Sequence, residues 1–127
     1  MALVRAFAER FAAARAIAGD DLARILVVVE ELVTNIVKYG YPPPAQPGTA
    51  EIALRLRDGE IGLEIVDDGQ AFDPFSGPEP DLDAPLEERT AGGLGLHIVK
   101  SLMDRTRYRR VAGHNVVEVW RRVASAK

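Results

Sequence analysis

The chain has 127 residues, of which 47% are hydrophobic and 28% charged, a composition typical of one globular domain that buries its own core. It has no cysteine, which excludes disulfides and thiolate chemistry and makes a cytoplasmic location the expectation. The formal net charge of −3 argues against direct nucleic-acid binding, and no apolar stretch reaches membrane-spanning length. We therefore expect a single domain over residues 1–127, with no nucleic-acid or membrane partner.

Two helices are predicted at the start of the chain. Apolar residues recur at helical spacing over residues 3–18, and Gly19 is expected to end this first helix. Asp20 or Asp21 is then expected to cap a second helix, whose wide apolar stripe runs to Gly40. A proline-rich connector follows, where no helix can continue.

The next segment is predicted to form a β-hairpin. Residues alternate in polarity over 50–57 and again over 60–67, and Asp58-Gly59 between them is a strong turn signal. Asp67 shares parity with the aliphatic residues of its strand, so its carboxylate should point to the buried face. A charge placed there needs a partner.

Residues 70–91 are rich in proline and acidic residues and are predicted to form a long loop that acts as a lid. A third helix follows the glycines at 92–95, and then a second hairpin over 105–111 and 115–123, turning near Gly113-His114. The basic run 105–110 is interpreted as a solvated edge strand rather than a nucleic-acid patch. Together these elements predict an α+β domain with helices on one face of a mainly antiparallel sheet.

Glu31 and Asn35 lie four residues apart on the second predicted helix and therefore on the same face. An amide oxygen is an adequate protein ligand for magnesium when ATP phosphates and water complete the shell. A nearby carboxylate can accept a proton from an attacking hydroxyl. Lys38, further along the helix, is a candidate counter-charge for phosphate. The alternative is an ordinary exposed helix face, with Glu31 either paired to Lys38 or simply solvated.

Two further segments supply the other groups that a nucleotide needs. Asp67 can accept the exocyclic amine of adenine, and Gly69 allows close approach of the backbone to the base. Gly92, Gly93, Leu94, Gly95 and Leu96 open a helix, where free amides and the helix dipole attract phosphate. The alternatives are a simple Asx turn at the first segment and a lid hinge at the second.

These three segments resemble known sequence boxes in the same order. Glu31-Leu-Val-Thr-Asn35 resembles the N box of GHKL ATP-binding domains, Asp67-Asp-Gly69 the G1 box, and Gly92-Gly-Leu-Gly-Leu96 the G2 box. The longer segments around them look most like the anti-sigma-factor serine kinases. Members commonly begin with a strand before the first helix, which this sequence does not show.

The resemblance implies a Bergerat fold, a two-layer α/β sandwich with a mainly antiparallel mixed sheet, that binds ATP and Mg²⁺. It implies that the protein phosphorylates a serine or threonine of a small STAS-type anti-sigma-factor antagonist and so controls a sigma factor, and it leaves a homodimer open. By position, Asn35 would ligate magnesium, Glu31 would be the general base, Asp67 would bind the adenine amine and Gly69 would line the base. Residues 92–96 would cover the phosphates.

Two alternatives to this kinase remain. One is a nucleotide-gated binding module that sequesters a partner without phosphorylating it. The other is the catalytic part of a two-component histidine kinase acting in trans, because Asn35-Ile-Val-Lys38-Tyr39 resembles the N box of those enzymes, in which the lysine contacts phosphate.

Overall fold

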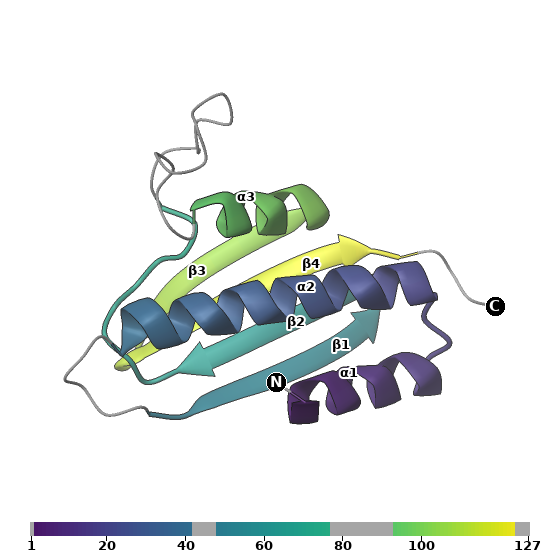
Figure 1. Ribbon diagram of the computed structural model, residues 1–127, viewed down its shortest axis with the longest axis horizontal. Coiled ribbons are helices and arrows are strands. Elements are labelled where there is room, and N and C mark those ends of the chain that lie inside the picture. The colour runs from purple at the N-terminus through teal and green to yellow at the C-terminus, as the bar shows by residue number, and fades with distance from the viewer. Residues whose placement is uncertain (1, 42–47, 77–92, 124–127) are drawn as a thin grey trace.

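A computed structural model describes residues 2–41, 48–76 and 93–123 of the chain (Figure 1). Its elements are the helices α1 (Ala2–Ala14), α2 (Gly19–Asn35), η1 (a π-helical turn, Ile36–Gly40) and α3 (Gly93–Leu102), and the strands β1 (Ala50–Arg57), β2 (Glu60–Asp67), β3 (Arg105–Val111) and β4 (His114–Arg122). The predicted order of helices and hairpins is confirmed. None of the helices in these ranges combines the length and apolarity needed to cross a bilayer.

The four strands form one sheet in the order β1-β2-β4-β3, and every neighbouring pair is antiparallel. The sheet is therefore antiparallel throughout the described strands, in agreement with the predicted mainly antiparallel sheet. The basic strand β3 lies at the sheet edge, as predicted, where unpaired backbone is protected by its charged side chains.

Helices cover one face of the sheet, with α2 lying across it and α1 and α3 on either side (Figure 1). Helix α2 contributes Ile25, Val28, Val29 and Leu32 to the core, and η1 adds Ile36. The inward residues of the strands also belong to the core: Ile61, Leu63 and Ile65 from β2, and Val117 and Val119 from β4. Val99 on α3 and Met103, directly after that helix, extend it on the other side of α2 from α1. Burial of these aliphatic side chains is the main stabilising term of the two-layer fold.

Helix α1 ends earlier than the sequence indicated. Ala16, not Gly19, takes the left-handed conformation, with a φ of 53°. The N–H of Ile17 donates to the carbonyl oxygen of Ala12 (2.9 Å), which completes a helix-ending motif that usually has glycine in the left-handed place. Ile17 packs against the core, and this burial holds Ala16 in its unfavourable conformation. Gly19 instead begins α2.

The predicted cap of α2 is also wrong. Ala18 occupies the cap position with extended backbone, and no side chain there makes a capping hydrogen bond. Asp20 and Asp21 lie in the first turn, where the positive end of the helix dipole favours carboxylates. Asp21 is buried because its Oδ1 accepts a hydrogen bond from Nε of Arg121 at 3.2 Å.

The first hairpin turn is confirmed and the second is shifted by one residue. Asp58 and Gly59 both have positive φ, at 54° and 75°, as the tight two-residue turn requires. In the second hairpin the left-handed residues are Ala112 and Gly113, at 48° and 81°, so β4 begins at His114.

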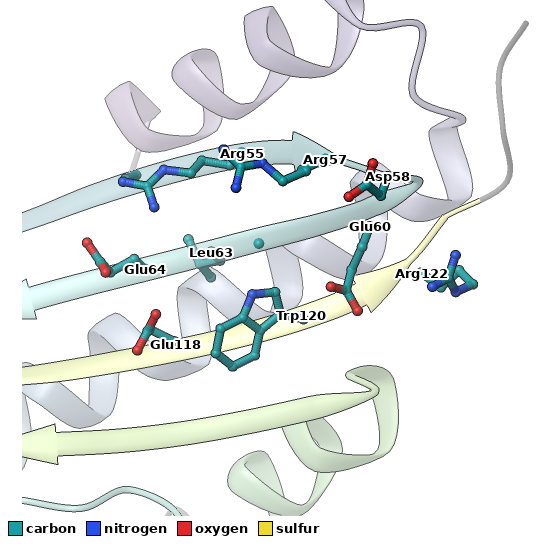
Figure 2. A pocket seen from close by; sticks show the side chains of 11 residues that line it. Arg55, Arg57, Asp58, Glu60, Leu63, Glu64, Glu118, Trp120 and Arg122 are labelled. Carbon is teal, nitrogen blue, oxygen red and sulfur yellow. The ribbon is translucent and has the colours of Figure 1, made fainter.

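The face of the sheet opposite the helices carries charged side chains and one aromatic ring. Figure 2 shows the indole of Trp120 among arginines and glutamates from β1, β2 and β4. A Cβ added to Gly62 would lie 3.3 Å from two ring atoms of Trp120, and the guanidinium of Arg105 lies 4.3 Å from the ring centroid. Trp120 therefore belongs to this outer face, where it packs against arginine and glycine rather than the core.

Candidate functional site

The predicted site segments come together at one end of the molecule. The C-terminal end of α2 with η1, the C-terminal end of β2 and the N-terminal end of α3 all lie at the left in Figure 1. Helices α2 and α3 are in contact. Hydrogen bonds join the end of η1 to the residues after β2, because the backbone N–H of Gln70 donates to the carbonyl oxygen of Gly40 (2.9 Å) and Nε2 of Gln70 to that of Tyr39 (2.8 Å).

Asn35 is the last residue of α2 and is only 2% exposed. Its Nδ2 donates to the carbonyl oxygen of Glu31 at 2.7 Å, which turns Oδ1 away from the helix backbone. Oδ1 of Asn35 is buried and has no hydrogen-bond partner within the described part of the chain. Such an atom costs stability unless something outside the described residues satisfies it.

Glu31 and Lys38 do not pair. Glu31 is half-buried one turn before Asn35, and Lys38 is exposed with its Nζ 5.5 Å from the ring centroid of Tyr39. The salt bridges between described residues include none that joins Glu31 to Lys38. The interpretation of this helix face as an ordinary surface ion pair is therefore not supported.

Asp67 points to the buried face, as its parity predicts, and is 1% exposed. Its Oδ1 accepts hydrogen bonds from the backbone N–H of Gly69 and from Nδ2 of Asn115, both at 2.9 Å. Both partners are neutral, and among the described residues neither a cation pairs with this carboxylate nor a donor reaches Oδ2. The second oxygen therefore has the capacity to accept a hydrogen bond from a ligand.

Gly69 lies where only glycine fits. A Cβ there would come within 2.6 Å of the carbonyl oxygen of Gly40 and within 3.0 Å of Oδ1 of Asp67. Gly40 itself is close to Asp67, since its own added Cβ would lie 3.7 Å from the same oxygen. The two glycines therefore let η1 and the turn after β2 touch beside the buried carboxylate.

The neighbouring Asp68 is exposed and forms a separate cluster on the other side of this turn. The Tyr41 hydroxyl donates to Oδ1 of Asp68, and the backbone N–H of Thr49 donates to the same oxygen at 3.1 Å. These hydrogen bonds lower the pKa of Asp68, the tyrosine contributing most. Burial first, and the hydrogen bond to Asp68 second, raise the pKa of Tyr41 to about 12. The cluster connects the segment before β1 to the end of β2.

Helix α3 begins at Gly93, which confirms a helix start within the glycine-rich segment. The backbone of Gly93, Leu94, Gly95 and Leu96 is helical, and nothing is described of their side chains. Gly92 and residues 77–91 of the predicted lid lie outside the described residues, so their predicted roles are untested. Over 70–76 the chain forms a turn in which Oδ1 of Asp73 accepts the N–H of Phe75 at 2.8 Å.

The structure adds residues that the sequence did not single out. Asn115 pairs with Asp67 across the β2–β4 register and is 2% exposed. Nη1 of Arg110 donates to the carbonyl oxygen of Gly69 at 2.8 Å and brings a positive charge to the edge of the site. Asn115 shares parity with Val117 and Val119, so a polar residue at an inward position was the available sequence signal.

The outer sheet face also has a hollow, of about 470 Å³. It is lined by Arg55, Arg57 and Glu64 on β1 and β2 and by Glu118, Trp120 and Arg122 on β4 (Figure 2). None of the predicted site residues lies there, and its lining combines exposed arginines with the buried Leu63 and the largely buried Glu118. We place the site by its buried polar atoms, which need a ligand, rather than by this open volume.

The residues present fit a magnesium nucleotide. An unsatisfied amide oxygen is a suitable ligand for a hard cation that keeps most of its shell for phosphate and water. A buried carboxylate with one free oxygen is an acceptor for an amine. Asn35 would hold the metal, and Asp67 with Gly69 would hold the base.

Comparison with known proteins identifies relatives for almost the whole chain. The family described as histidine kinase-like ATPase domain matches residues 1–120. Serine/threonine-protein kinase BtrW of Bordetella bronchiseptica is 31% identical over 91 residues, covering 72% of this chain and 63% of BtrW. Serine-protein kinase RsbW of Halalkalibacterium halodurans is 30% identical over 98 residues, covering 74% of this chain and 59% of RsbW. The chain thus spans about three-fifths of the length of these curated relatives.

Solved structures show the same fold at lower identity. The RsbU and RsbW domains of Rv1364c from Mycobacterium tuberculosis match with a TM-score of 0.64 and 23% identity, covering 95% of this chain and 28% of that one. The blue-light activated histidine kinase of Erythrobacter litoralis matches with a TM-score of 0.62 and 17% identity, covering 84% and 32%. These likenesses confirm the predicted α+β architecture.

Proposed function

Because the chain belongs to the histidine kinase-like ATPase family, we propose that it binds MgATP and transfers the terminal phosphate to a serine or threonine of a small protein partner. The observation that carries the proposal is the buried, unpartnered Oδ1 of Asn35, one helical turn from Glu31. The relatives at about 30% identity are named serine kinases, which supports the choice of acceptor residue.

In the proposed reaction Glu31 acts as the general base. Its carboxylate takes the proton as the O–H bond of the serine or threonine breaks; the hydroxyl oxygen forms a bond to the terminal phosphorus, and the bond to the ADP oxygen breaks. Bound magnesium would neutralise charge on the phosphates. Asp67 and Gly69 hold the base at the opposite end, and residues 92–96, with Lys38, are proposed to bind the phosphates.

We further propose the partner class that the sequence resemblance implies. The acceptor would be a STAS-type anti-sigma-factor antagonist, and its phosphorylation would decide whether a sigma factor is held or released. This switching function is supported by the relationship to RsbW and BtrW, which extends over about three-quarters of this chain.

Nucleotide binding tests the site. Isothermal titration with ATP should show that Asn35→Ala loses the magnesium dependence of binding and that Asp67→Asn loses preference for ATP over GTP. Asp58→Asn is the matched control for Asp67, because Asp58 lies exposed in a turn that accepts asparagine equally well. If Asn35→Ala binds MgATP like the wild type, the metal assignment is wrong.

Phosphate transfer tests the chemistry. With labelled ATP and purified STAS-type antagonists, Glu31→Gln should keep ATP binding and slow transfer about 100-fold or more. Glu30→Gln, which removes an exposed carboxylate from the adjacent helix position, should leave transfer unchanged. Tight ATP binding without a phosphoprotein from any antagonist would instead favour a binding-only module.

A further inference from the structure

Asn115 uses all the hydrogen-bonding capacity of its side chain at the predicted base-binding end of the site. Its Nδ2 donates to Oδ1 of Asp67 at 2.9 Å and to the carbonyl oxygen of Gln70 at 2.8 Å. Its Oδ1 accepts the backbone N–H of Phe72 at 3.2 Å and the hydroxyl of Tyr108 at 2.6 Å. A primary amide offers two donors and two acceptor positions, so the group is fully satisfied.

The partners of Oδ1 decide which way the amide faces. The oxygen and nitrogen of an amide are almost equal in shape, so a flip of the group costs only the hydrogen bonds that it breaks. The N–H of Phe72 can only donate, and the hydroxyl of Tyr108 donates to the same oxygen in this structure, so the two together direct Nδ2 to Asp67. A flipped amide would present its oxygen to the Asp67 carboxylate and to the carbonyl of Gln70, setting acceptor against acceptor.

When the Asn115 amide is fixed in this orientation, Oδ2 of Asp67 is the carboxylate oxygen that remains to accept a hydrogen bond. Gly69 and Asn115 both donate to Oδ1, and the described residues offer no donor to Oδ2. A carboxylate held in this way can receive the 6-amino group of adenine, but it meets guanine with the 6-carbonyl, which is another acceptor. A site that demands a donor at one ligand position rejects the analogue that lacks it.

We propose that Tyr108 is a positioning residue for purine selectivity, acting through Asn115 to hold Asp67 as a pure acceptor for an amine. The inference rests on the proposed function, since it takes Asp67 as the adenine-reading group. Tyr108 lies on β3, and its ring packs against the core. Replacing it by phenylalanine therefore removes the hydroxyl and keeps the packing.

The test is the ratio of the dissociation constants for GTP and ATP, measured by calorimetry on the wild type, Tyr108→Phe, Tyr41→Phe and Asp67→Asn. Losing one hydrogen bond that fixes the amide should lower the ratio about tenfold in Tyr108→Phe. Tyr41→Phe removes a hydroxyl that bonds the neighbouring Asp68 and not Asn115, so it should keep the wild-type ratio.

A second variant tests whether Asn115 must present a donor to Asp67. Asn115→Asp places a carboxylate against Oδ1 of Asp67, so that the two groups share one proton and ATP binding weakens as the pH rises. A wild-type ratio in Tyr108→Phe, or an equal loss of ATP and GTP affinity together with a lower unfolding midpoint, overturns the inference. If the wild type does not prefer ATP, or Asp67→Asn keeps the preference, the proposed adenine site fails first and the inference falls with it.

Discussion

Asp67 on the inner face of the sheet and the glutamates of the outer face have opposite kinds of partner. On the inner face, Asp67 is 1% exposed and accepts hydrogen bonds from neutral groups. On the outer face, Glu118 forms salt bridges with Arg107 and Arg109, with N···O distances of 2.7 and 3.3 Å. Glu60 forms a salt bridge with Arg105 at 2.7 Å. Glu118 and Glu60 are thus paired with arginines, whereas Asp67 has no cation partner among the described residues.

Under the proposed function, this difference separates a carboxylate that contacts a ligand from carboxylates that stay near solvent. A buried carboxylate without a counter-charge costs stability, so its retention indicates a use that folding does not supply. Ion pairs with a well-exposed partner contribute little to stability, and the arginines of β3 protect the sheet edge from pairing with other chains. Each prediction below changes one side of this comparison and is measured as the free energy of unfolding in urea.

The largest effect is expected from a methyl group added to the inner face. Gly69→Ala places a Cβ 2.6 Å from the carbonyl oxygen of Gly40, a backbone atom that cannot turn aside. We expect a loss of about 2–3 kcal/mol together with weaker ATP binding. Gly62→Ala on the outer face is the matched control: its Cβ would meet the Trp120 side chain at 3.3 Å, which can shift. A cost at Gly62 as large as that at Gly69 would contradict the distinction.

The next prediction compares two buried carboxylates on the helix-covered side of the sheet, Asp21 on α2 and Asp67 on β2. Asp21 accepts a hydrogen bond from Arg121, which is 22% exposed, so Asp21→Ala leaves a largely buried guanidinium with one partner fewer and should cost about 2 kcal/mol. Asp67→Asn removes a charge that has no cation partner and should change stability by less than about 1 kcal/mol.

Arg24→Ala is the control for this pair. Arg24 also approaches Asp21, at 3.8 Å, but its side chain is 40% exposed, so its removal should have little effect on stability. Equal losses in Asp21→Ala and Asp67→Asn would show that both carboxylates are structural.

Between the two faces, the Tyr41–Asp68 cluster should make stability depend on pH at both extremes. The pKa of Asp68 is lowered from 3.8, so the ionised carboxylate contributes to the free energy of unfolding above that pH. This contribution is lost as the pH falls through the folded-state pKa. The pKa of Tyr41 is raised from 10.0 to about 12, so its contribution is present below pH 10.0 and is lost between those values.

Tyr41→Phe removes the hydrogen bond between Tyr41 and Asp68. The free energy of unfolding should then change less with pH at both the acid and the alkaline end. Its stability should differ most from the wild type near neutral pH, and the two proteins should converge at the acid and alkaline ends. A constant difference at all pH values would mean that the hydroxyl acts through packing alone.

Much of this arrangement could be predicted from local sequence. The alternation of β1 and β2 and the Asp58-Gly59 turn are set by neighbouring residues, and the parity that buries Asp67 follows from the same alternation. The stripe of α2 correctly predicted its buried face because helical periodicity is a property of the helix alone.

The remainder depended on residues far apart in the chain. Ala16 is left-handed because Ile17 is drawn into the core, so Gly19 was the wrong choice for the helix end. Asn115 reaches Asp67 through the β2–β4 register, and pattern alone cannot specify which strands become neighbours. The sequence named candidate site residues from the plainest motifs, but it did not indicate that Asn115 contacts Asp67.

The smallest effect is expected on the outer face. Both Nε and Nη2 of Arg107 donate to Oε1 of Glu118, at 3.0 and 2.7 Å, which is favourable geometry, yet the arginine side chain is 52% exposed. A double-mutant cycle between Arg107→Ala and Glu118→Ala should therefore give a coupling of about 0.5 kcal/mol or less, falling further in high salt. Arg109 also reaches Glu118 and partly replaces Arg107 once that residue is removed. A coupling as large as the free energy of unfolding lost in Asp21→Ala would show that solvent screens this face less than its exposure indicates. The difference between Asp67 and the outer-face glutamates would then have to rest on hydrogen bonding rather than on burial.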